Sequence, residues 1–296
     1  IGNGLHNLLY SADMKFGKSV MLSPAATRFP RLETLLLEGT YGGKDNILPS
    51  KNEVYAYLKD IINDTIKNKG KCLIPVLGSG RAQDLMIMIE ELVRTKQIKE
   101  VDVFIDGIVW DITAIHTAYP EFLNSSIRKQ IFHKDNNPFL SKIFKRVGSG
   151  KERKEVIEEG KPCIILATSG MLIGGPSVEY LRSLSDNPKN ALIFSSYQGE
   201  GSLGRRIRNG EREIIFKNGS KKETCEIKMQ VHKIEISDHS DRRELMNFVG
   251  RLNPRPKKIL INHGENSRAL DLASSLHKTY RLETSVPRNL DSVRIK

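Results

Sequence analysis

The sequence has no apolar run approaching the roughly 20 residues that a membrane-crossing helix needs, and no signal-peptide pattern opens it. It has only three cysteines in 296 residues, Cys72, Cys163 and Cys225, and none forms a CxxC pair. Because Cys72 and Cys163 lie in apolar, strand-like runs, the cysteines are predicted to be reduced core residues of a cytoplasmic protein. These absences argue against a membrane protein and against a disulfide-framed secreted domain.

The Walker phosphate loop is also missing, although glycine-rich turns are present. The turn Gly78-Ser79-Gly80 is not followed by Gly-Lys-Ser/Thr, and Glu152 stands after Gly148-Ser149-Gly150-Lys151 where Ser or Thr is required. A nucleotide-binding α/β protein is therefore an interpretation that rests on glycine turns alone.

Positive charge is in excess. Lysine and arginine number 47 against 35 acidic residues, for a formal net charge of +12. Such an excess predicts an anionic partner, nucleic acid first and an acidic protein second. Alternatively, the excess of lysine reflects a lysine-rich composition of the whole proteome. Net charge alone is therefore weak evidence for an anionic partner.

The pattern divides the chain into three segments. Residues 43–220 alternate strands and helices with glycine turns and arginines, whereas residues 1–42 and 221–296 carry Asp, Glu and His residues at strand ends. We therefore predict an α/β protein in which one domain, residues 43–220, is inserted into another. Residues 122–144 are interpreted as irregular and basic.

Four polar side chains follow strand-like runs in the outer segments: Asp13, Glu38, His239 and His263. A strand ending near His239, a helix over Asp241–Arg251 and a strand ending before His263 predict a βαβ unit. Its right-handed crossover would place both histidines on one sheet edge, where ligands bind. A lone histidine is more often a structural residue and a strand-end carboxylate is often a cap, so both interpretations stay open.

Carboxylates and imidazoles suit zinc, which prefers N and O ligands in such sets. Two histidines and one aspartate are nevertheless too few for a two-metal hydrolytic site, so we expect further ligands from sequence preceding this chain. The opening turn Gly2-Asn3-Gly4 leads into an apolar strand without an earlier partner strand, which also predicts a larger polypeptide.

Phosphate-binding groups are predicted in the middle segment. Arg81 begins a helix after a glycine turn, Ser169 lies in the small-residue turn Thr168-Ser169-Gly170-Met171, and Arg205 and Arg206 begin a helix beside another glycine-rich turn. Helix-start amides and guanidinium groups both bind phosphate oxygens. For the two arginines a solvated basic face is an equally good interpretation.

Seven motifs together carry a family resemblance. They are Ser11-Ala12-Asp13, Glu38-Gly39-Thr40-Tyr41-Gly42, Gly80-Arg81-Ala82-Gln83-Asp84, Ala167-Thr168-Ser169-Gly170-Met171 with Gly174-Gly175-Pro176, Gly201-Ser202-Leu203-Gly204-Arg205-Arg206, Asp238-His239-Ser240-Asp241 and Asn262-His263-Gly264-Glu265. Over essentially its whole length the chain resembles the metallo-β-lactamase/β-CASP nucleases. It is most similar to the archaeal branch related to the cleavage and polyadenylation specificity factor nuclease, which acts in RNA 3′-end formation and transcription termination.

The resemblance implies a partial metallo-β-lactamase αββα domain, residues 1–42 and 221–296, with an inserted β-CASP α/β domain at 43–220. It implies a zinc-dependent endoribonuclease, with 5′-3′ exonuclease action in some relatives.

The resemblance also implies residue roles. Asp13 would bridge two zinc ions and His263 would ligate zinc, while His239, oriented by Glu38, would serve as general acid near the scissile phosphate. Ser169 and Arg205 would face the RNA. With Arg206 and Arg81, which the residue pattern indicates, they make up the predicted RNA- or phosphate-binding set. The family has Ser or Ala at the position of Gly39, a small departure that should not disturb the neighbouring carboxylate.

One departure is large. The family's His-x-His-x-Asp-His motif is absent, since no two of the seven histidines are separated by a single residue, and amino-terminal KH domains are absent too. We therefore expect this chain to be inactive alone, with zinc partly or wholly missing, until the N-terminal half carrying that motif is supplied.

Further partners follow from the resemblance: single-stranded RNA, a second copy through residues 285–296, and RNA polymerase. The alternative is a catalytically incomplete RNA-binding and dimerisation module. The intact Asp13, Glu38, His239 and His263 argue against that alternative.

Overall fold

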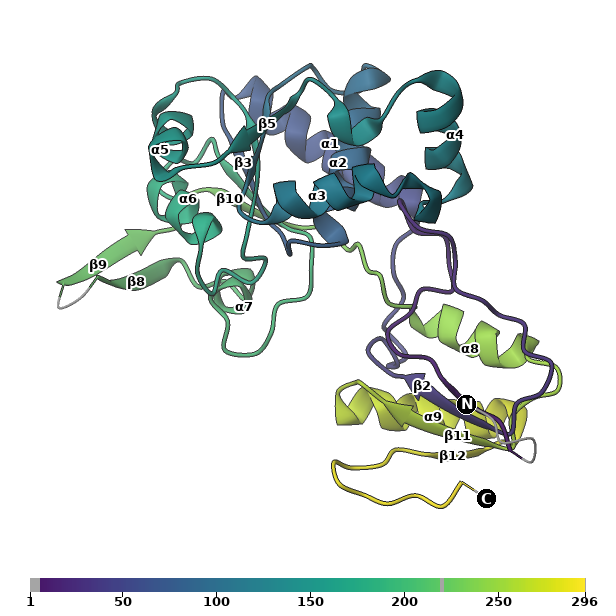
Figure 1. Ribbon diagram of the computed structural model, residues 1–296. Coiled ribbons are helices and arrows are strands. Elements are labelled where there is room, and N and C mark those ends of the chain that lie inside the picture. Colours follow the sequence, from purple (N-terminus) through teal and green to yellow (C-terminus); the bar gives the residue numbers. More distant parts are fainter. Residues whose placement is uncertain (1–5, 219–220, 296) are drawn as a thin grey trace. The chain divides into compact units, whose positions relative to one another are not determined.

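The computed structural model describes residues 6–218 and 221–295, and contacts divide the chain into two compact units (Figure 1). Unit 1 comprises Ile1–Leu48 and Ser237–Lys296, and unit 2 comprises Pro49–Ile236. The division falls at 48/49 and 236/237, later than the 42/43 and 220/221 boundaries expected from the sequence pattern. The predicted turn at Gly2-Asn3-Gly4 lies outside the described residues.

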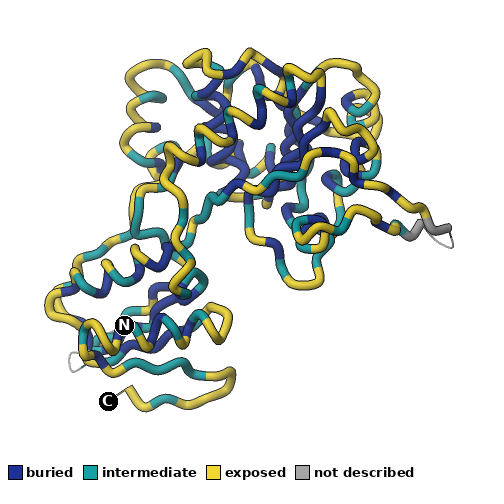
Figure 2. The backbone as a smooth tube through the Cα atoms, turned by 180° about the vertical axis from the view of Figure 1, so that it is seen from behind, coloured by how far each residue is buried: buried dark blue, intermediate teal, exposed yellow. Residues whose placement is uncertain are grey.

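Unit 2 is built on a six-stranded parallel sheet with strand order β10-β7-β3-β6-β4-β5. Its strands are β3 (Cys72–Pro75), β4 (Val103–Asp106), β5 (Phe144–Val147), β6 (Ile164–Ala167), β7 (Ala191–Phe194) and β10 (Gln230–Lys233). Every residue of β3, β6 and β7 is buried (Figure 2). Continuous apolar runs are typical of parallel strands covered on both faces, which explains why these strands were predicted.

Helices connect the strands of unit 2. They are α1 (Lys51–Lys67), α2 (Arg81–Arg94), α3 (Val109–Ala118), α4 (Ser125–Lys134), α5 (Gly150–Glu158), α6 (Pro176–Leu184) and α7 (Leu203–Arg208), with short 3-10 turns η1 (Pro120–Phe122) and η2 (Pro138–Leu140). Ser50 and Glu53 form a capping box at the start of α1, and the prediction that Arg81 begins a helix is confirmed.

The irregular structure predicted over residues 122–144 is wrong. Helix α4 occupies the centre of that region, and the Asn124 side chain caps it by accepting a hydrogen bond from the Ile127 amide. Ile127 is the one buried residue of α4. Among its apolar residues, only Ile127 and the half-buried Ile131 turn inward, so the apolar pattern is too short to identify a helix from sequence.

After residue 212 the chain forms a two-stranded ribbon and then an edge strand of the unit 2 sheet. Strands β8 (Glu213–Asn218) and β9 (Lys221–Glu226) form an antiparallel ribbon that projects from unit 2 (Figure 1). The chain leaves the ribbon after Glu226, and β10 then pairs in parallel with β7.

Unit 1 contains a four-stranded parallel sheet with order β1-β2-β11-β12 and two helices. The elements are β1 (Leu8–Tyr10), β2 (Thr34–Glu38), α8 (Arg242–Arg251), β11 (Lys258–Asn262), α9 (Asn266–Tyr280) and β12 (Glu283–Ser285). The core packs Leu35, Leu37 and Ile261 of the sheet with Phe248 of α8 and Leu272 of α9.

The βαβ unit predicted around the two histidines is wrong. Residues 234–236 form no strand, and β10 belongs to the sheet of unit 2, so α8 does not cross between neighbouring strands of one sheet. The apolar run before His239 instead follows β7, since the Ile234 amide donates to the Phe194 carbonyl at 2.8 Å. Within the described residues, no helix is long and apolar enough to cross a membrane.

Candidate metal centre

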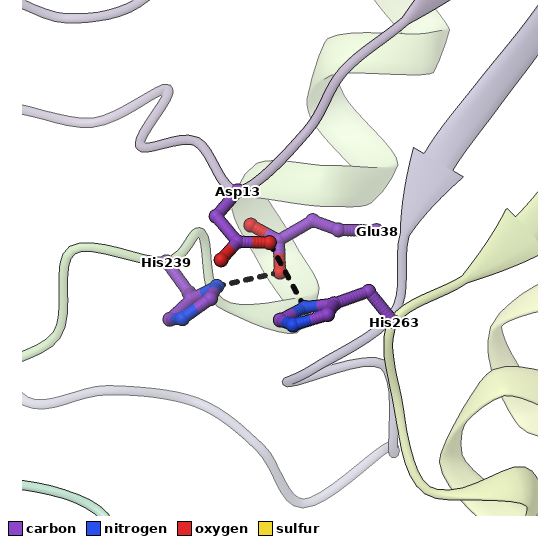
Figure 3. A group of neighbouring side chains, drawn as sticks. All are labelled: Asp13, Glu38, His239 and His263. Atoms are coloured by element: carbon purple, nitrogen blue, oxygen red, sulfur yellow. Dashed lines mark hydrogen bonds and ion pairs between the residues drawn. The ribbon is translucent and has the colours of Figure 1, made fainter.

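Four side chains with metal-ligand chemistry meet in unit 1 (Figure 3). Asp13, Glu38, His239 and His263 each offer a ligand-type atom, and these atoms all lie within 4.8 Å of one another. Asp13 follows β1, Glu38 ends β2 and His263 follows β11, which are adjacent strands of one parallel sheet. Their strand ends therefore lie along one edge, as ligand-binding residues do in α/β sheets.

His239 reaches the cluster from the loop before α8. The Ser240 amide donates to the Met14 carbonyl at 2.9 Å, and the Ser240 hydroxyl accepts from the Phe16 amide at 2.8 Å. Asp241 then caps α8 with a capping box. The two hydrogen bonds of Ser240 thus hold the segment containing His239 against the loop that carries Asp13.

Glu38 is fully buried, and both of its carboxylate oxygens accept hydrogen bonds. Oε1 accepts from the Met14 amide at 3.0 Å and Oε2 lies 2.8 Å from Nδ1 of His239. Burial raises the pKa of Glu38, but hydrogen bonds from His239, Met14 and Thr40 outweigh it, so the net pKa is lowered. Both oxygens of the buried Glu38 carboxylate are therefore occupied by hydrogen bonds from neighbouring groups.

The same contact orients His239. Its hydrogen bond to Glu38 raises the pKa of the imidazole, against the opposing effect of burial, and the charges of Glu38 and Asp13 raise it further. Because Nδ1 is engaged by Glu38, Nε2 is the ring nitrogen that remains for a ligand or a proton. Figure 3 shows the ring beside that of His263, with centroids 5.7 Å apart and planes 19° from parallel.

Asp13 and His263 form the exposed side of the cluster. Their Oδ1 and Nδ1 atoms lie 2.9 Å apart, with about half of each side chain exposed. The Thr40 hydroxyl donates to the His263 carbonyl at 2.9 Å and lies 3.2 Å from Nδ1. His263 and Ala12, the neighbour of Asp13, both have φ of 48°. For non-glycine residues that conformation costs on the order of 1–3 kcal/mol, and such strain clusters at functional sites.

The donor set fits zinc. Imidazole nitrogens and carboxylate oxygens are its usual ligands outside thiolate sites. Asp13 and His263 are accessible, whereas both oxygens of Glu38 are already engaged. The geometry therefore favours Asp13 and His263 as metal ligands, with Glu38 holding His239.

The other predicted site residues lie in unit 2. Ser169 is half-buried, donates to the Gly174 carbonyl at 3.1 Å and accepts from the Ile173 amide at 3.0 Å, so its hydroxyl holds the loop after β6. Arg205 is half-buried, and its Nη1 donates to the Gln198 carbonyl at 3.3 Å.

Arg206 and Arg81 are held by acidic neighbours. Arg206 is exposed, and its guanidinium makes two hydrogen bonds with Glu211, one of them at 2.7 Å. Arg81 is only 7% exposed and its Nη1 lies 3.7 Å from Asp84. A phosphate that bound either arginine would have to compete with a carboxylate already in place.

A buried polar cluster at the carboxyl end of β4 was not predicted. Asp106, 2% exposed, accepts from Arg153 Nε at 2.8 Å and Nη2 at 3.1 Å, and from the Tyr180 hydroxyl at 3.0 Å. The sequence signal was the strand-end pair Asp106-Gly107, the same pattern as Glu38-Gly39. A Cβ on Gly107 would lie 2.2 Å from Thr168 Oγ1, so this cluster adjoins the loop that holds Ser169. Thr40, the neighbour of His263, was likewise missed as a site residue.

Known proteins match both units. A Beta-Casp domain model matches residues 82–207, and a model of the Zn-dependent metallo-hydrolase RNA specificity domain matches residues 224–287. The chain is similar to proteins described as transcription termination factor FttA from Thermococcus kodakarensis (50% identity over 298 residues), Methanocaldococcus jannaschii (50% over 299) and Methanothermobacter thermautotrophicus (51% over 298). These alignments cover 100% of this chain and 46%, 47% and 47% of the relatives, so the chain spans about half their length.

Proposed function

The chain belongs to the metallo-β-lactamase/β-CASP nuclease family, and on that premise we propose that it is part of a zinc-dependent endoribonuclease acting in transcription termination and RNA 3′-end processing. The cluster of Asp13, Glu38, His239 and His263 is the observation that carries the proposal. Zinc bound there would supply charge stabilisation at the phosphodiester and a water of lowered pKa. The proposal includes a 5′-3′ exonuclease activity, which the family resemblance implies.

The four residues of the cluster have separate proposed roles in catalysis. Asp13 and His263 would hold the metal from the exposed side of the cluster. His239 donates a proton from Nε2 to the leaving oxygen, while Glu38 fixes the ring through Nδ1 and favours its protonated form. The buried, ionised state of Glu38 supports that orienting role, because a carboxylate with both oxygens engaged cannot rotate freely.

RNA would bind through unit 2. Of the two arginines on α7, Arg205 is the stronger candidate for phosphate binding. It donates to a neutral carbonyl, whereas Arg206 is paired with Glu211. Ser169 would act through the loop it holds, and Arg81 through the start of α2. The partner is single-stranded RNA, and the proposed location is the cytoplasm.

The four clustered side chains do not complete a two-zinc site, because each catalytic zinc takes about three protein ligands. We place the remaining ligands in a preceding segment with a His-x-His-x-Asp-His motif, on the same or another chain. The relatives, about twice as long as this chain, support this.

Reconstitution tests the proposal. The chain is combined with the amino-terminal half of the Methanothermobacter relative, and zinc content and cleavage of single-stranded RNA are measured together. We expect about two zinc ions per complex. His239→Ala should keep the zinc and lose about 10²–10⁴-fold in cleavage rate, as for removal of a general acid. Asp13→Asn should lose zinc and activity together. Two bound zinc ions without any cleavage would refute the nuclease.

A second candidate is an RNA-binding and dimerisation module. The segment after β12 supports it, because Leu290 and Ile295 are exposed apolar residues there, which suit a self-association surface. We propose dimerisation through residues 285–296 for either function, and association with RNA polymerase for the termination factor. Zinc-free RNA binding by the reconstituted complex would favour this module over the enzyme.

A further inference from the structure

Helix α4 carries an exposed aromatic ring with two cations on the preceding turn. Phe132 is 60% exposed, and its predecessors at i−4 and i−3, Arg128 and Lys129, are exposed beside it. Residues at these spacings are neighbours on a helix surface. The opposite face turns inward, with Ile127 buried and Ile131 half-buried. The ring therefore stands on the solvent face and contributes nothing to the core of unit 2.

A second aromatic precedes the helix. Phe122, the last residue of η1, is 74% exposed, while the next residue, Leu123, is buried. Figure 1 shows α4 at the margin of unit 2, at the other end of the unit from the β8–β9 ribbon. We call Phe122, Arg128, Lys129 and Phe132 the α4 surface. Single exposed apolar residues are common, whereas the α4 surface combines two exposed aromatic rings with two exposed cations.

The charge of α4 has one sign. Its sequence Ser-Ser-Ile-Arg-Lys-Gln-Ile-Phe-His-Lys contains no acidic residue. Among the ion pairs of the described residues, none involves Arg128, Lys129 or Lys134, although many other basic residues of unit 2 are paired, such as Arg153. These cations are available to a polyanion without displacing a carboxylate.

We propose that the α4 surface binds single-stranded RNA, with bases stacking on Phe122 and Phe132 and phosphates contacting Arg128 and Lys129. The inference rests on the proposed ribonuclease function and adds a binding surface outside the predicted set of Ser169, Arg205, Arg206 and Arg81. Grooves that bind single strands combine such cations with exposed aromatic rings, because every base has a face that can stack.

A protein partner fits less well. Protein–protein interfaces are enriched in aromatic residues and arginine but depleted in lysine. Here Phe132 has a cation at both neighbouring positions of the preceding turn. The combination of exposed rings with positive charge, on a helix that has no acidic residue, therefore favours a nucleic acid over an apolar protein surface.

The test is a fluorescence-anisotropy titration of the intact chain with a labelled oligouridine of about 16 nucleotides, long enough for one binding site of this kind. The double variant Phe122→Ala/Phe132→Ala should bind about 5- to 150-fold more weakly for each ring that stacks on a base. Phe132→Leu should be weakened like Phe132→Ala, because it retains apolar volume but lacks the ring. Tyr57→Ala is the matched control: Tyr57 is an exposed aromatic on α1 that lies near the acidic residues Asp60 and Asp64.

Salt dependence tests the cations. Arg128→Gln/Lys129→Gln should reduce the slope of log affinity against log salt by about 1.4, the value for two phosphate contacts on a single strand. Lys151→Gln/Lys154→Gln on α5 removes the same charge elsewhere and should leave the slope nearly unchanged. An equal effect of both pairs would overturn the inference, since it would indicate net charge rather than a surface.

The other outcomes separate the two proposals. If the parent chain binds the RNA and the α4 variants bind equally well, the α4 surface is refuted while the proposed function stands. If the parent chain binds no RNA at low salt, both the α4 surface and the proposed RNA binding by unit 2 are refuted. Crosslinks from thiouridine-substituted RNA should map to residues 122–134, and crosslinks confined to other segments would contradict the assignment.

Discussion

Replacing Arg153 by alanine should destabilise unit 2 severely. Arg153 makes two hydrogen bonds to Asp106, which is 2% exposed, and one to Glu179 at 2.6 Å. The Asp106 hydrogen bond raises the pKa of Arg153, and burial and then Asp106 raise that of Tyr180, which stays protonated as a donor. Arg153→Ala leaves the Asp106 carboxylate buried with the Tyr180 hydroxyl as its remaining side-chain donor among the described residues.

Breaking a buried ion pair from one side costs about 3–5 kcal/mol, because the remaining charge loses its partner but stays out of water. For a unit of this size, each kcal/mol corresponds to about 2–4 °C in Tm, so we expect a fall on the order of 6–20 °C. The chain has a single tryptophan, Trp110, which lies on α3. Its fluorescence during urea unfolding therefore reports on unit 2 separately from unit 1.

Glu179 provides the matched control. Its side chain is 57% exposed, so Glu179→Gln removes a screened pair and should cost only about 0–1 kcal/mol. A loss below about 1 kcal/mol for Arg153→Ala would refute the reasoning, since the Asp106 carboxylate would then have found water or another donor.

Three further predictions concern single residues. Thr40→Val removes the hydroxyl that contacts His263 and should weaken zinc binding by about 10–100-fold in the reconstituted complex, as loss of an outer contact does; unchanged affinity in a chelator competition would contradict this. Ser50→Ala removes the capping box of α1 and should cost about 0.5–2 kcal/mol in urea unfolding followed by tryptophan fluorescence, whereas Ser50→Asp should restore most of it. Gly70→Ala would bring a Cβ to 1.8 Å from the Lys189 carbonyl oxygen, so overpacking should cost about 1–3 kcal/mol by the same measurement; a neutral effect would mean that the backbone there shifts freely.

Local signals in the sequence were sufficient for much of the fold. The capping box of α1, the limits of α2 and the continuous apolar strands of unit 2 depend on interactions within a few residues. The strand-end positions of Asp13, Glu38 and His263 were also readable, because consecutive apolar residues followed by a polar one predict where a parallel strand ends. The ordered motifs identified the family, which the two domain matches confirm.

Tertiary structure decided the rest. The apolar residues before His239 suited a strand of either sheet, and only the available edge of β7 determined that β10 pairs in unit 2. The Asp106–Arg153 pair joins residues 47 positions apart. Helix α4 buries a single side chain, so its apolar pattern is too short to identify a helix. Sequence alone thus determined short-range structure and the chemical nature of the site residues. Which strands pair, and which distant side chains meet, depends on competition among long-range contacts that no local pattern records.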